Sequence, residues 1–416
     1  MNGDAPLSLF QGYGIEIEYM IVDAETLSVR PICDEVLRAE GGAYESELAL
    51  GEIAWSNELA LHVIELKTNG PANTLANLHQ PFQEHVARVN GVLADFGARL
   101  LPTGMHPWMN AEREFRVWPH EYNAVYQTFD RIFGCAGHGW ANLQSTHINL
   151  PFATDAEFGR LHAAIRLVLP IIPGIAASTP FADGKLTGLL DSRLDHYARN
   201  AIRVPIVTGA VIPEPIFTID EYRLGLLGRI YADLAPLDPG GVLRHEWVNA
   251  RGSIARFDRM ALEIRLLDTQ ECPAADMAAV AIVVAAVRAL VEEAWCGSKQ
   301  QRQWDHRELA QLLRVTVDQG DGAVIENHRF LQCFGFPERG RARCLELWQH
   351  IAETALARAE LADAIQAALD VMLRQGCLAR RIVAAVGDDD SGESLRDVYA
   401  RLAECLATGS PFEIDS

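Results

Sequence analysis

Two acidic side chains stand two residues apart in segment 12–19, among large apolar residues. In a β-strand such residues share a face, so Glu16 and Glu18 point to one side while Ile15 and Ile17 point to the other. Two unit charges about 5 Å apart, at an effective dielectric constant of about 20, repel each other by roughly 3 kcal/mol. A bound divalent cation would relieve this repulsion. The alternative is a solvated edge strand.

A second pair of acids, Glu58 and Glu65, lies in segment 57–66. Positions an odd number of residues apart cannot share a face of one uninterrupted strand. We therefore expect Glu65 on a strand and Glu58 on a turn or beyond a bulge. Large apolar residues surround these acids too, which argues against a simple solvated face.

Segment 259–266 combines an acid with two arginines. As a strand, it places Arg259, Glu263 and Arg265 on one face. The opposite face is apolar and comprises Met260, Leu262, Ile264 and Leu266. The pattern fits either a salt-bridged solvent face or a site where a carboxylate holds metal and an arginine meets a transferring phosphate.

Segment 144–151 presents a histidine beside an amide, because His147 and Asn149 share one strand face. A single histidine of this kind is often structural. In a chain with five acids on strand-like segments, it is also a candidate metal ligand. Oxygen-rich ligation with one histidine suits Mg²⁺ or Mn²⁺ better than structural zinc.

The charge balance and the absence of common motifs narrow the function. With 36 basic and 56 acidic residues among 416, the net charge of −20 argues against nucleic acid or an anionic membrane as partner. Residues 1–10 lack the features of a signal peptide, so we expect a cytoplasmic protein. The eight cysteines include no Cys-x-x-Cys pair. Neither a phosphate loop nor a dinucleotide fingerprint occurs, so metal ions would have to carry the phosphates of any bound nucleotide.

Two regions follow one another along the chain. Residues 9–272 alternate strand-like segments with helices such as 75–96, and from residue 273 the pattern is helical. In that second region we expect helices over 274–295, 306–318, 344–373 and 394–407, with Ser394 as the N-cap of the last.

Four motifs in this order resemble glutamate–cysteine ligases, which belong to the glutamine synthetase-like superfamily of ATP-dependent carboxylate–amine ligases. They are Gly-x-Glu-x-Glu at 14–18, the acids Glu58 and Glu65, His-x-Asn at 147–149, and Glu-x-Arg followed by Asp at 263–268. The resemblance implies an α+β fold, in which a curved, mainly antiparallel sheet forms an active-site funnel surrounded by helices. It also implies one catalytic domain over 1–416, with the motifs at about 9–272 and a helical elaboration at about 273–410.

The resemblance further implies a role for individual residues. The metal ligands would be Glu16, Glu18, Glu58, Glu65, His147 and Glu263. Arg265 would face the γ-phosphate of ATP, with Arg259 as a second phosphate contact. Arg131 resembles an arginine near the reacting centre, and Arg193 and Tyr197 resemble residues that receive the amino-acid substrate.

The implied reaction joins glutamate to cysteine through a γ-glutamyl phosphate, with release of ADP and phosphate. Carboxylate–amine ligases of a related subgroup often carry two histidines one residue apart, whereas this chain has His147-Ile148-Asn149, which favours the glutamate–cysteine ligases. The alternatives are another amine or amino acid as acceptor, a metal-dependent hydrolase, and a non-catalytic metal-binding relative. Glu52 and Glu246 are candidates for the general base. A homo-oligomer is compatible with the sequence.

Overall fold

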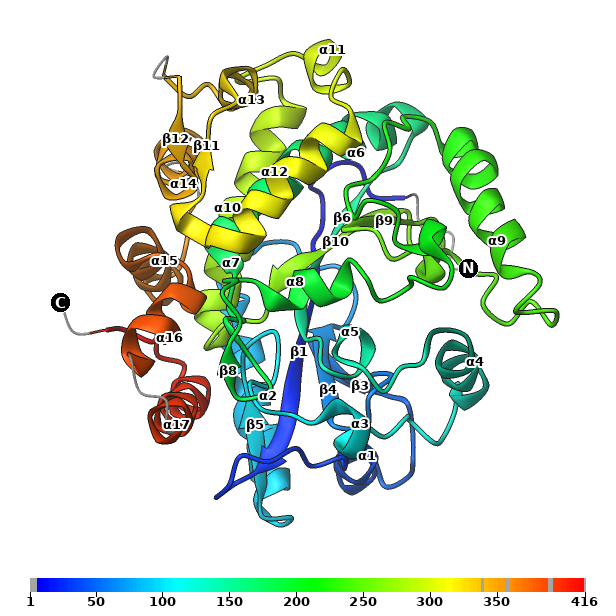
Figure 1. Ribbon diagram of the computed structural model, residues 1–416, viewed down its shortest axis with the longest axis vertical. Coiled ribbons are helices and arrows are strands. Elements are labelled where there is room, and N and C mark those ends of the chain that lie inside the picture. Colours follow the sequence, from blue (N-terminus) through cyan, green and yellow to red (C-terminus); the bar gives the residue numbers. More distant parts are fainter. Residues whose placement is uncertain (1–5, 338–339, 357–359, 388–391, 415–416) are drawn as a thin grey trace.

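The protein is described here by a computed structural model that covers residues 6–337, 340–356, 360–387 and 392–414 (Figure 1). The strands are β1 (Gly14–Asp23), β2 (Glu47–Leu50), β3 (Ile53–Asn57), β4 (Val63–Thr68), β5 (Ala98–Leu101), β6 (Ser145–Pro151), β7 (Phe181–Ala182), β8 (Lys185–Leu186), β9 (Ser253–Arg256), β10 (Ala261–Asp268), β11 (Val324–Ile325) and β12 (Ala342–Arg343). The α-helices are α1 (Cys33–Gly41), α2 (His79–Ala94), α3 (Ala111–Glu114), α4 (Asn123–Phe133), α5 (His138–Ala141), α6 (Asp155–Val168), α7 (Pro173–Ala176), α8 (Ser192–Tyr197), α9 (Gly228–Leu234), α10 (Pro273–Val291), α11 (Ser298–Gln301), α12 (His306–Gln319), α13 (His328–Cys333), α14 (Cys344–Ile351), α15 (Asp363–Gln375), α16 (Leu378–Val386) and α17 (Glu393–Thr408). Short 3₁₀ or π-helical turns are η1 (Leu169–Ile171), η2 (Pro205–Val207), η3 (Glu221–Leu227), η4 (Glu246–Val248), η5 (Gly320–Gly322) and η6 (Ala352–Leu356).

An eight-stranded sheet forms the centre of the molecule. Seven strands follow the order β2-β3-β4-β1-β6-β10-β9, and β5 pairs with the C-terminal part of β1. Each of these pairings is antiparallel. Figure 1 shows β1 as the long central strand that joins the lower half of the sheet to β6, β10 and β9 above. The predicted α+β fold, with a mainly antiparallel sheet among helices, is confirmed.

The two faces of β1 differ in polarity, as its alternating sequence predicts. Ile15, Ile17 and Tyr19 belong to the main hydrophobic core, where their side chains are inaccessible to solvent. Glu16 and Glu18 alternate with them and therefore lie on the other face. A slip of one residue in strand pairing would carry both glutamates into the core, so burial of the apolar face fixes the register.

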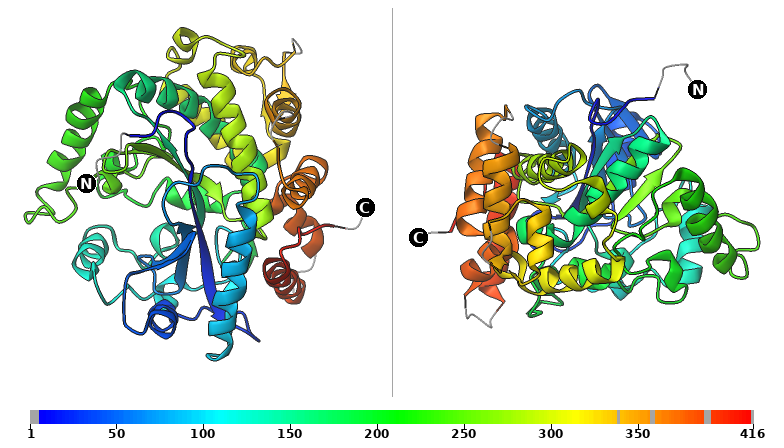
Figure 2. Two further views of the ribbon diagram at one scale, coloured as in Figure 1. Left: turned by 180° about the vertical axis from the view of Figure 1, so that it is seen from behind. Right: turned by 90° about the horizontal axis from the view of Figure 1, so that it is seen from above.

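Helices cover the apolar face of the sheet. Helix α2 packs against β3, β4 and β5, α6 packs against β10, and α10 contacts α2, α6 and α15. In the view from above in Figure 2, α14 to α17 lie on one side of the sheet, while α4 and α9 lie on the other. The predicted helices 75–96, 274–295 and 306–318 are confirmed as α2, α10 and α12.

Among the described helices, α10 is the one that is long and apolar enough to cross a bilayer by length and composition. Its most apolar window is 89% buried inside the protein. Burial on all sides explains why this helix is apolar around its whole circumference.

Three local predictions are wrong. The expected helix 344–373 is divided into α14, the π-helical turn η6 and α15, and residues 357–359 between them lie outside the described part of the chain. Helix α17 begins at Glu393 after Gly392, so Ser394 is not its N-cap. Finally, Arg259 and Met260 do not extend β10, because both lie in the tight turn between β9 and β10, where Met260 has φ +50°.

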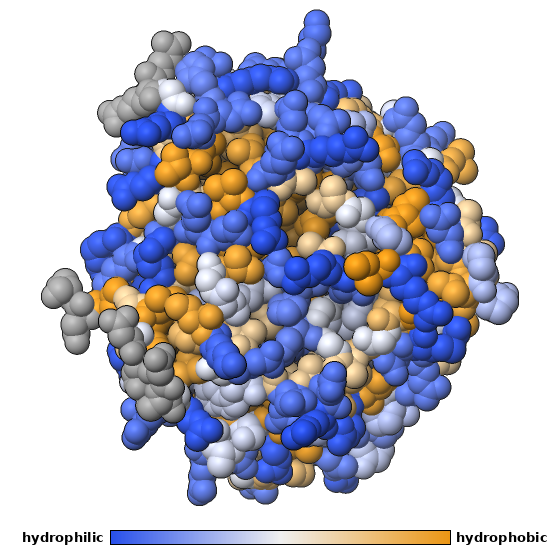
Figure 3. Space-filling model, viewed as in Figure 1, coloured by the Kyte–Doolittle hydropathy of each residue, from blue (hydrophilic) through white to orange (hydrophobic). Residues whose placement is uncertain are grey.

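The hydrophobic core joins the motif-bearing region to the helical region. One continuous cluster includes Ile15 and Ile264 from the sheet together with Val280, Leu347 and Leu369 from helices after residue 272. This shared core supports the proposal of a single domain. Hydrophilic residues cover most of the face shown in Figure 3 and interrupt its hydrophobic patches.

The contact between α7 and α14 gives the first testable prediction. A β-carbon at Gly174 would lie 2.2 Å from Cys344 Sγ, in a fully buried position. We expect Gly174→Ala to lower the free energy of unfolding by about 1–3 kcal/mol, because the core cannot accommodate an added methyl group. The matched control is Gly91→Ala on α2, where a β-carbon meets nothing within 4 Å. In that variant the free energy of unfolding should rise by about 0.5–1 kcal/mol, because alanine has a higher helix propensity than glycine. Urea denaturation measures both changes, and equal effects would contradict the predicted packing.

Candidate active site

A cleft of about 600 Å³ opens on the polar face of the sheet. Strands β4, β1, β6 and β10 contribute its floor, and α4 with the residues just before it contributes one wall. The lining carboxylates are Glu16, Glu18, Glu45, Glu47, Glu58, Glu65, Glu121 and Glu263, and the lining cations are Lys67, Arg256, Arg259 and Arg265. His147 lies among them. The structure therefore brings all six predicted metal ligands to one cleft.

Strand register places these groups beside one another. Glu16 on β1 is paired with Lys67 on β4 and with His147 on β6. His147 Nδ1 lies 3.2 Å from Glu16 Oε2, and Asn149 Nδ2 donates to Glu16 Oε1 at 3.1 Å. The imidazole and the amide are thus on one face, as the sequence predicts. The Oδ1 atom of Asn149 is buried and has no hydrogen-bond partner in the described structure.

Two acids on neighbouring strands of the cleft floor lie directly opposite each other. Glu18 on β1 faces Glu65 on β4. Like charges in this position destabilise strand pairing. Hydrogen bonds offset part of this repulsion: the Ser145 backbone N–H donates to Glu18 at 2.7 Å, and the Ser56 hydroxyl donates to Glu65 at 2.6 Å.

Strand β10 carries a bulge at the site. Its register against β6 shifts between Ile264 and Leu267, so Arg265 and Leu266 together stand opposite His147. An extra residue bends a strand and redirects the side chains beside it. Glu263 lies on the same strand, 1% exposed, and its Oε1 atom is 3.9 Å from His147 Nδ1.

Two overlapping groups of side chains have the geometry of a cation site. The ligand atoms of Glu16, His147 and Glu263 lie within 4.8 Å of one another, and so do those of Glu18, Glu65 and His147. Carboxylate oxygens with one imidazole nitrogen suit Mg²⁺ or Mn²⁺. The residues present therefore fit a divalent cation. Glu58 follows the end of β3 and enters the cleft from the loop before β4, off the strand as predicted.

The proton affinities of the acids reflect their crowding. Burial and the charge of Glu16 raise the pKa of Glu65 to about 7. Burial and the charges of Glu18 and Glu65 raise the pKa of Glu58 well above its usual value. Glu16 differs, because its hydrogen bond with His147 and nearby positive charges outweigh burial and lower its pKa. Without a cation, the cleft thus holds more acids than its own cations neutralise.

Each lining cation contacts at least one of the lining acids, and Lys67 contacts both Glu47 and Glu65. Arg259 Nη1 lies 3.1 Å from Glu16 Oε1, which places this arginine at the cleft although it is outside the strand. Arg265 Nε lies 2.7 Å from Glu263 Oε1 without the alignment of a hydrogen bond. The sequence did not predict two of the lining cations, Arg256 and Lys67. Arg256 Nη1 contacts Glu263 at 3.0 Å, and Lys67 Nζ contacts Glu65 at 3.2 Å. The position of Lys67, two residues after Glu65, was the available signal for its face.

Three predicted residues are not brought to the cleft wall. Arg131 on α4 is exposed, and its guanidinium donates to the carbonyl of Leu237 at 2.8 Å. Arg193 is 1% exposed and pairs with Asp268. Tyr197 is buried, and its hydroxyl donates to the carbonyl of Arg251 at 3.4 Å. The roles predicted for these residues from the resemblance stay predictions.

The two candidate bases also lie apart from the cleft lining. Glu52 is exposed in the turn between β2 and β3. Glu246 accepts the backbone N–H of Phe257 at 2.7 Å, so its carboxylate holds the β9–β10 turn. The sequence identifies no general base, and neither residue is assigned that role.

The raised pKa of Glu65 gives a prediction about stability in the absence of divalent cations. The folded state keeps the Glu65 proton up to about pH 7, whereas the unfolded chain releases it near the ordinary value of 4.5. Folding stability should therefore fall as pH rises from 4.5 to 7. In Glu65→Gln we expect a smaller slope, because this proton no longer titrates. Thermal melts in chelator measure the slope, with the exposed Glu52→Gln as control.

Divalent cation supplies the second half of this test. Mg²⁺ or Mn²⁺ at pH 7.5 should raise the melting temperature of the unmodified protein, because a ligand that binds the folded state stabilises it. The rise should be smaller in Glu65→Gln. Identical slopes and identical cation responses in both proteins would show that Glu65 is only a solvated acid.

Comparison with known proteins agrees with the geometry. The profile of glutamate–cysteine ligase family 2 matches residues 13–400. An uncharacterised protein from Archaeoglobus fulgidus is 40% identical over 280 residues, which are 67% of this chain and 75% of that protein. A protein of Rubrobacter xylanophilus with the provisional name glutamate–cysteine ligase 2-3 is 28% identical over 180 residues, 43% of this chain and 46% of its own.

A solved structure shares the fold. Glutamate–cysteine ligase from Francisella tularensis, in complex with AMP, aligns with a TM-score of 0.57 and 12% identity, covering 95% of this chain and 89% of that one. The sheet, the cleft and the match along nearly the whole sequence lead to one assignment. The chain belongs to glutamate–cysteine ligase family 2.

Proposed function

We propose that the protein is an ATP-dependent carboxylate–amine ligase that uses glutamate as the acid and cysteine as the first candidate amine. The observation that carries this proposal is the meeting of six ligand-type side chains and Arg265 in one cleft. Family membership and the AMP held by the Francisella enzyme support a nucleotide substrate. Another amine or amino acid as acceptor is the alternative.

The proposed reaction has two steps. The side-chain carboxylate of glutamate attacks the γ-phosphorus of ATP, the bond to the β-phosphate oxygen breaks, and ADP leaves. The amine then attacks the carbonyl carbon of the γ-glutamyl phosphate, loses a proton, and displaces inorganic phosphate. A carboxylate alone is a poor acylating agent, and phosphorylation supplies the leaving group.

The acids of the cleft would hold the cation and position the substrate phosphates. Glu16, Glu263 and His147 form one ligand group, and Glu18, Glu65 and His147 form the other. Glu58 would complete the set from its loop. A bound Mg²⁺ or Mn²⁺ would neutralise phosphate oxygens and fix their orientation. Before a cation binds, Lys67 would neutralise part of the charge of Glu65.

The arginines would stabilise negative charge on the phosphoryl group. Arg265 has a planar fork that can contact two phosphate oxygens at once. Burial lowers the pKa of its guanidinium, but the charge of Glu263 and other neighbours outweighs this and raises it, so Arg265 stays charged. Arg259, which is exposed, would be a second phosphate contact. In many enzymes, such oriented charges make the largest single contribution to the rate enhancement.

Two other classes of protein would use part of the same cleft. A metal-dependent hydrolase needs the acids and a histidine but has no use for an arginine that faces a phosphate. A non-catalytic relative would be expected to lack some ligand positions, whereas all six are present here. We also propose a cytoplasmic location, with small-molecule substrates as partners; the oligomeric state is left open.

The reaction predicts a strict requirement for all components. Purified protein with ATP, Mg²⁺ and glutamate should release ADP in repeated turnovers only when an amine is added, because the second step regenerates the site. Cysteine, other amino acids and simple amines are compared, and mass spectrometry identifies the product. A chelator should abolish turnover. Phosphate release without amine, or turnover without ATP, would favour the hydrolase.

Arg265→Lys tests geometry apart from charge. Lysine keeps the positive charge but loses the planar fork. We expect turnover to fall by roughly 10²- to 10³-fold, with the KM of the amine and the melting temperature nearly unchanged. Steady-state kinetics and thermal melts decide the outcome. Retained turnover with a lowered melting temperature would mean that Arg265 is only a structural ion-pair partner.

A further inference from the structure

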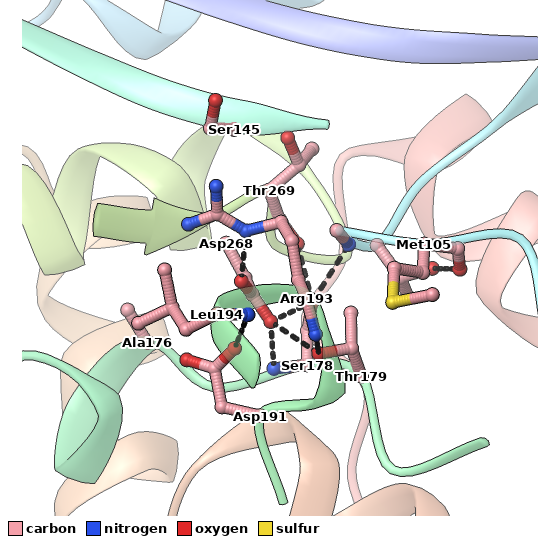
Figure 4. Close-up of polar contacts among 12 residues, drawn as sticks. Met105, Ser145, Ala176, Ser178, Thr179, Asp191, Arg193, Leu194, Asp268 and Thr269 are labelled. Atoms are coloured by element: carbon pink, nitrogen blue, oxygen red, sulfur yellow. Dashed lines mark hydrogen bonds and ion pairs between the residues drawn. The ribbon is translucent and has the colours of Figure 1, made fainter. Parts of the chain in front are cut away.

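A buried ion pair lies directly behind the bulge of β10. Arg193, from the first turn of α8, donates from Nε to Asp268 Oδ1, and both residues are inaccessible or nearly inaccessible to solvent. Figure 4 shows the carboxylate of Asp268 enclosed by Arg193, Ser178 and Thr179. Neither member of the pair lines the cleft. The pair can influence the cleft through the elements that it holds.

Asp268 is fully engaged by hydrogen-bond donors. Besides Arg193, it accepts the Ser178 backbone N–H at 2.7 Å, the Ser178 hydroxyl at 3.2 Å and the Thr179 hydroxyl at 3.0 Å. A β-carbon at Gly104 would lie 2.7 Å from Asp268 Cγ, so the backbone also approaches closely from that side. A carboxylate held this tightly fixes the end of β10.

The same arginine reaches the backbone at the bulge. Both terminal nitrogens of Arg193 lie 3.4 Å from the carbonyl oxygen of Arg265. A bulge leaves a main-chain group outside the regular ladder, and a buried carbonyl without a partner is destabilising. Arg193 supplies the donors, while the N–H of Arg265 pairs with the carbonyl of Gly252 at 3.0 Å. The peptide units around Arg265 are therefore held from both sides.

Helix α8 carries a second buried residue, Tyr197, in the electrostatic field of Arg265. Tyr197 lies four residues after Arg193, so the two share a face of the helix. Burial raises the pKa of the Tyr197 hydroxyl, and the positive charge of Arg265 partly offsets this rise. Through Arg193, this short helix holds the backbone carbonyl of Arg265.

We propose that the Arg193–Asp268 pair is a clamp on the β10 bulge that positions Arg265 for phosphoryl transfer. Arg193 is then a positioning residue, in place of the substrate-binding role suggested by the resemblance. A substrate carboxylate would have to displace a buried, fully hydrogen-bonded Asp268 to reach it. This inference rests on the proposed function, because the role of Arg265 does.

Three variants separate the clamp from a general effect on folding. Arg193→Lys keeps the charge beside Asp268 but cannot also reach the Arg265 carbonyl with a second donor. Asp268→Asn keeps the shape and the bonds from Ser178, and serves if the first variant does not fold. The matched control is Arg381→Lys, since Arg381 is equally buried and pairs with Glu271 at 2.6 Å, away from Arg265.

The kinetic result distinguishes positioning from substrate binding. In Arg193→Lys and Asp268→Asn we expect kcat to fall about 10- to 100-fold while the KM of glutamate changes less than about threefold. Arg381→Lys should lower the melting temperature but keep kcat within about threefold. A raised glutamate KM at unchanged kcat would overturn the proposal in favour of substrate binding.

A double-mutant cycle tests whether Arg193 acts through Arg265. In an Arg265→Lys background, Arg193→Lys should cause little further loss, because the group it positions has been replaced. Labelled ATP makes the low residual rates measurable. Losses that multiply would show independent roles and overturn the proposal.

Amide hydrogen exchange of segment 262–268 gives a readout that needs no turnover. Exchange should become faster in Arg193→Lys and Asp268→Asn but not in Arg381→Lys, since only the first two loosen the bulge. If the unmodified protein is inactive with every amine, the proposed function fails and the role of the pair in phosphoryl transfer fails with it. Unchanged exchange would show that the clamp itself does not exist.

Discussion

The structure depends on keeping mutually repelling carboxylates together on one face of a sheet. Glu18 and Glu65 face each other across two strands, and Glu16 lies one step along β1. In water such side chains would separate, but strand register holds them in place and burial raises the pKa of Glu65 to about 7. Lys67, Arg256 and Arg259 neutralise part of this charge from the edges of the cleft. The charge that remains unneutralised would favour binding of a cation.

Burial of the apolar side of the same sheet stabilises the strands that carry these carboxylates. Ile15, Ile17 and Tyr19 are buried against a core that continues into α10 and the later helices. Because a slip of one residue would exchange the two faces of β1, burial of its apolar face specifies the register and so holds the carboxylates together. Helix α10 contributes nothing to the cleft by contact, yet it stabilises the surface on which the cleft is built.

The bulge of β10 links this core to the cleft. It places two residues opposite His147, and the second layer behind it is polar: Arg193, Asp268, Ser178 and Thr179 are all buried. Buried ion pairs contribute little net stability when compared with apolar packing. Their benefit here is geometric, since a guanidinium with several donors defines the position of a carbonyl more narrowly than apolar contacts do. Tyr122, which also lines the cleft, adopts φ +65° and is 59% exposed.

Local pattern in the sequence determined which residues share a face. The two-residue period put Glu16 beside Glu18 and His147 beside Asn149, and the odd spacing of Glu58 and Glu65 placed Glu58 off the strand. Helices α2 and α12 followed from local sequence pattern, and α10 followed from its long apolar run. These features depend on neighbours within a few residues, so they can be read from the chain.

Only the tertiary structure decided which strands lie side by side and what stands behind them. The order β4-β1-β6-β10-β9 brings Lys67 and Arg256 to the acids, and no spacing along the chain encodes that order. The bulge at Arg265 arises from pairing with β6, and Arg193 is drawn inward by Asp268, 75 residues away. The β9–β10 turn directs Arg259 toward Glu16. The alternation of polar and apolar residues would by itself extend β10 through this position. Each depends on the packing of distant segments, because the free energy that selects them comes from burial and long-range pairing and not from local propensity.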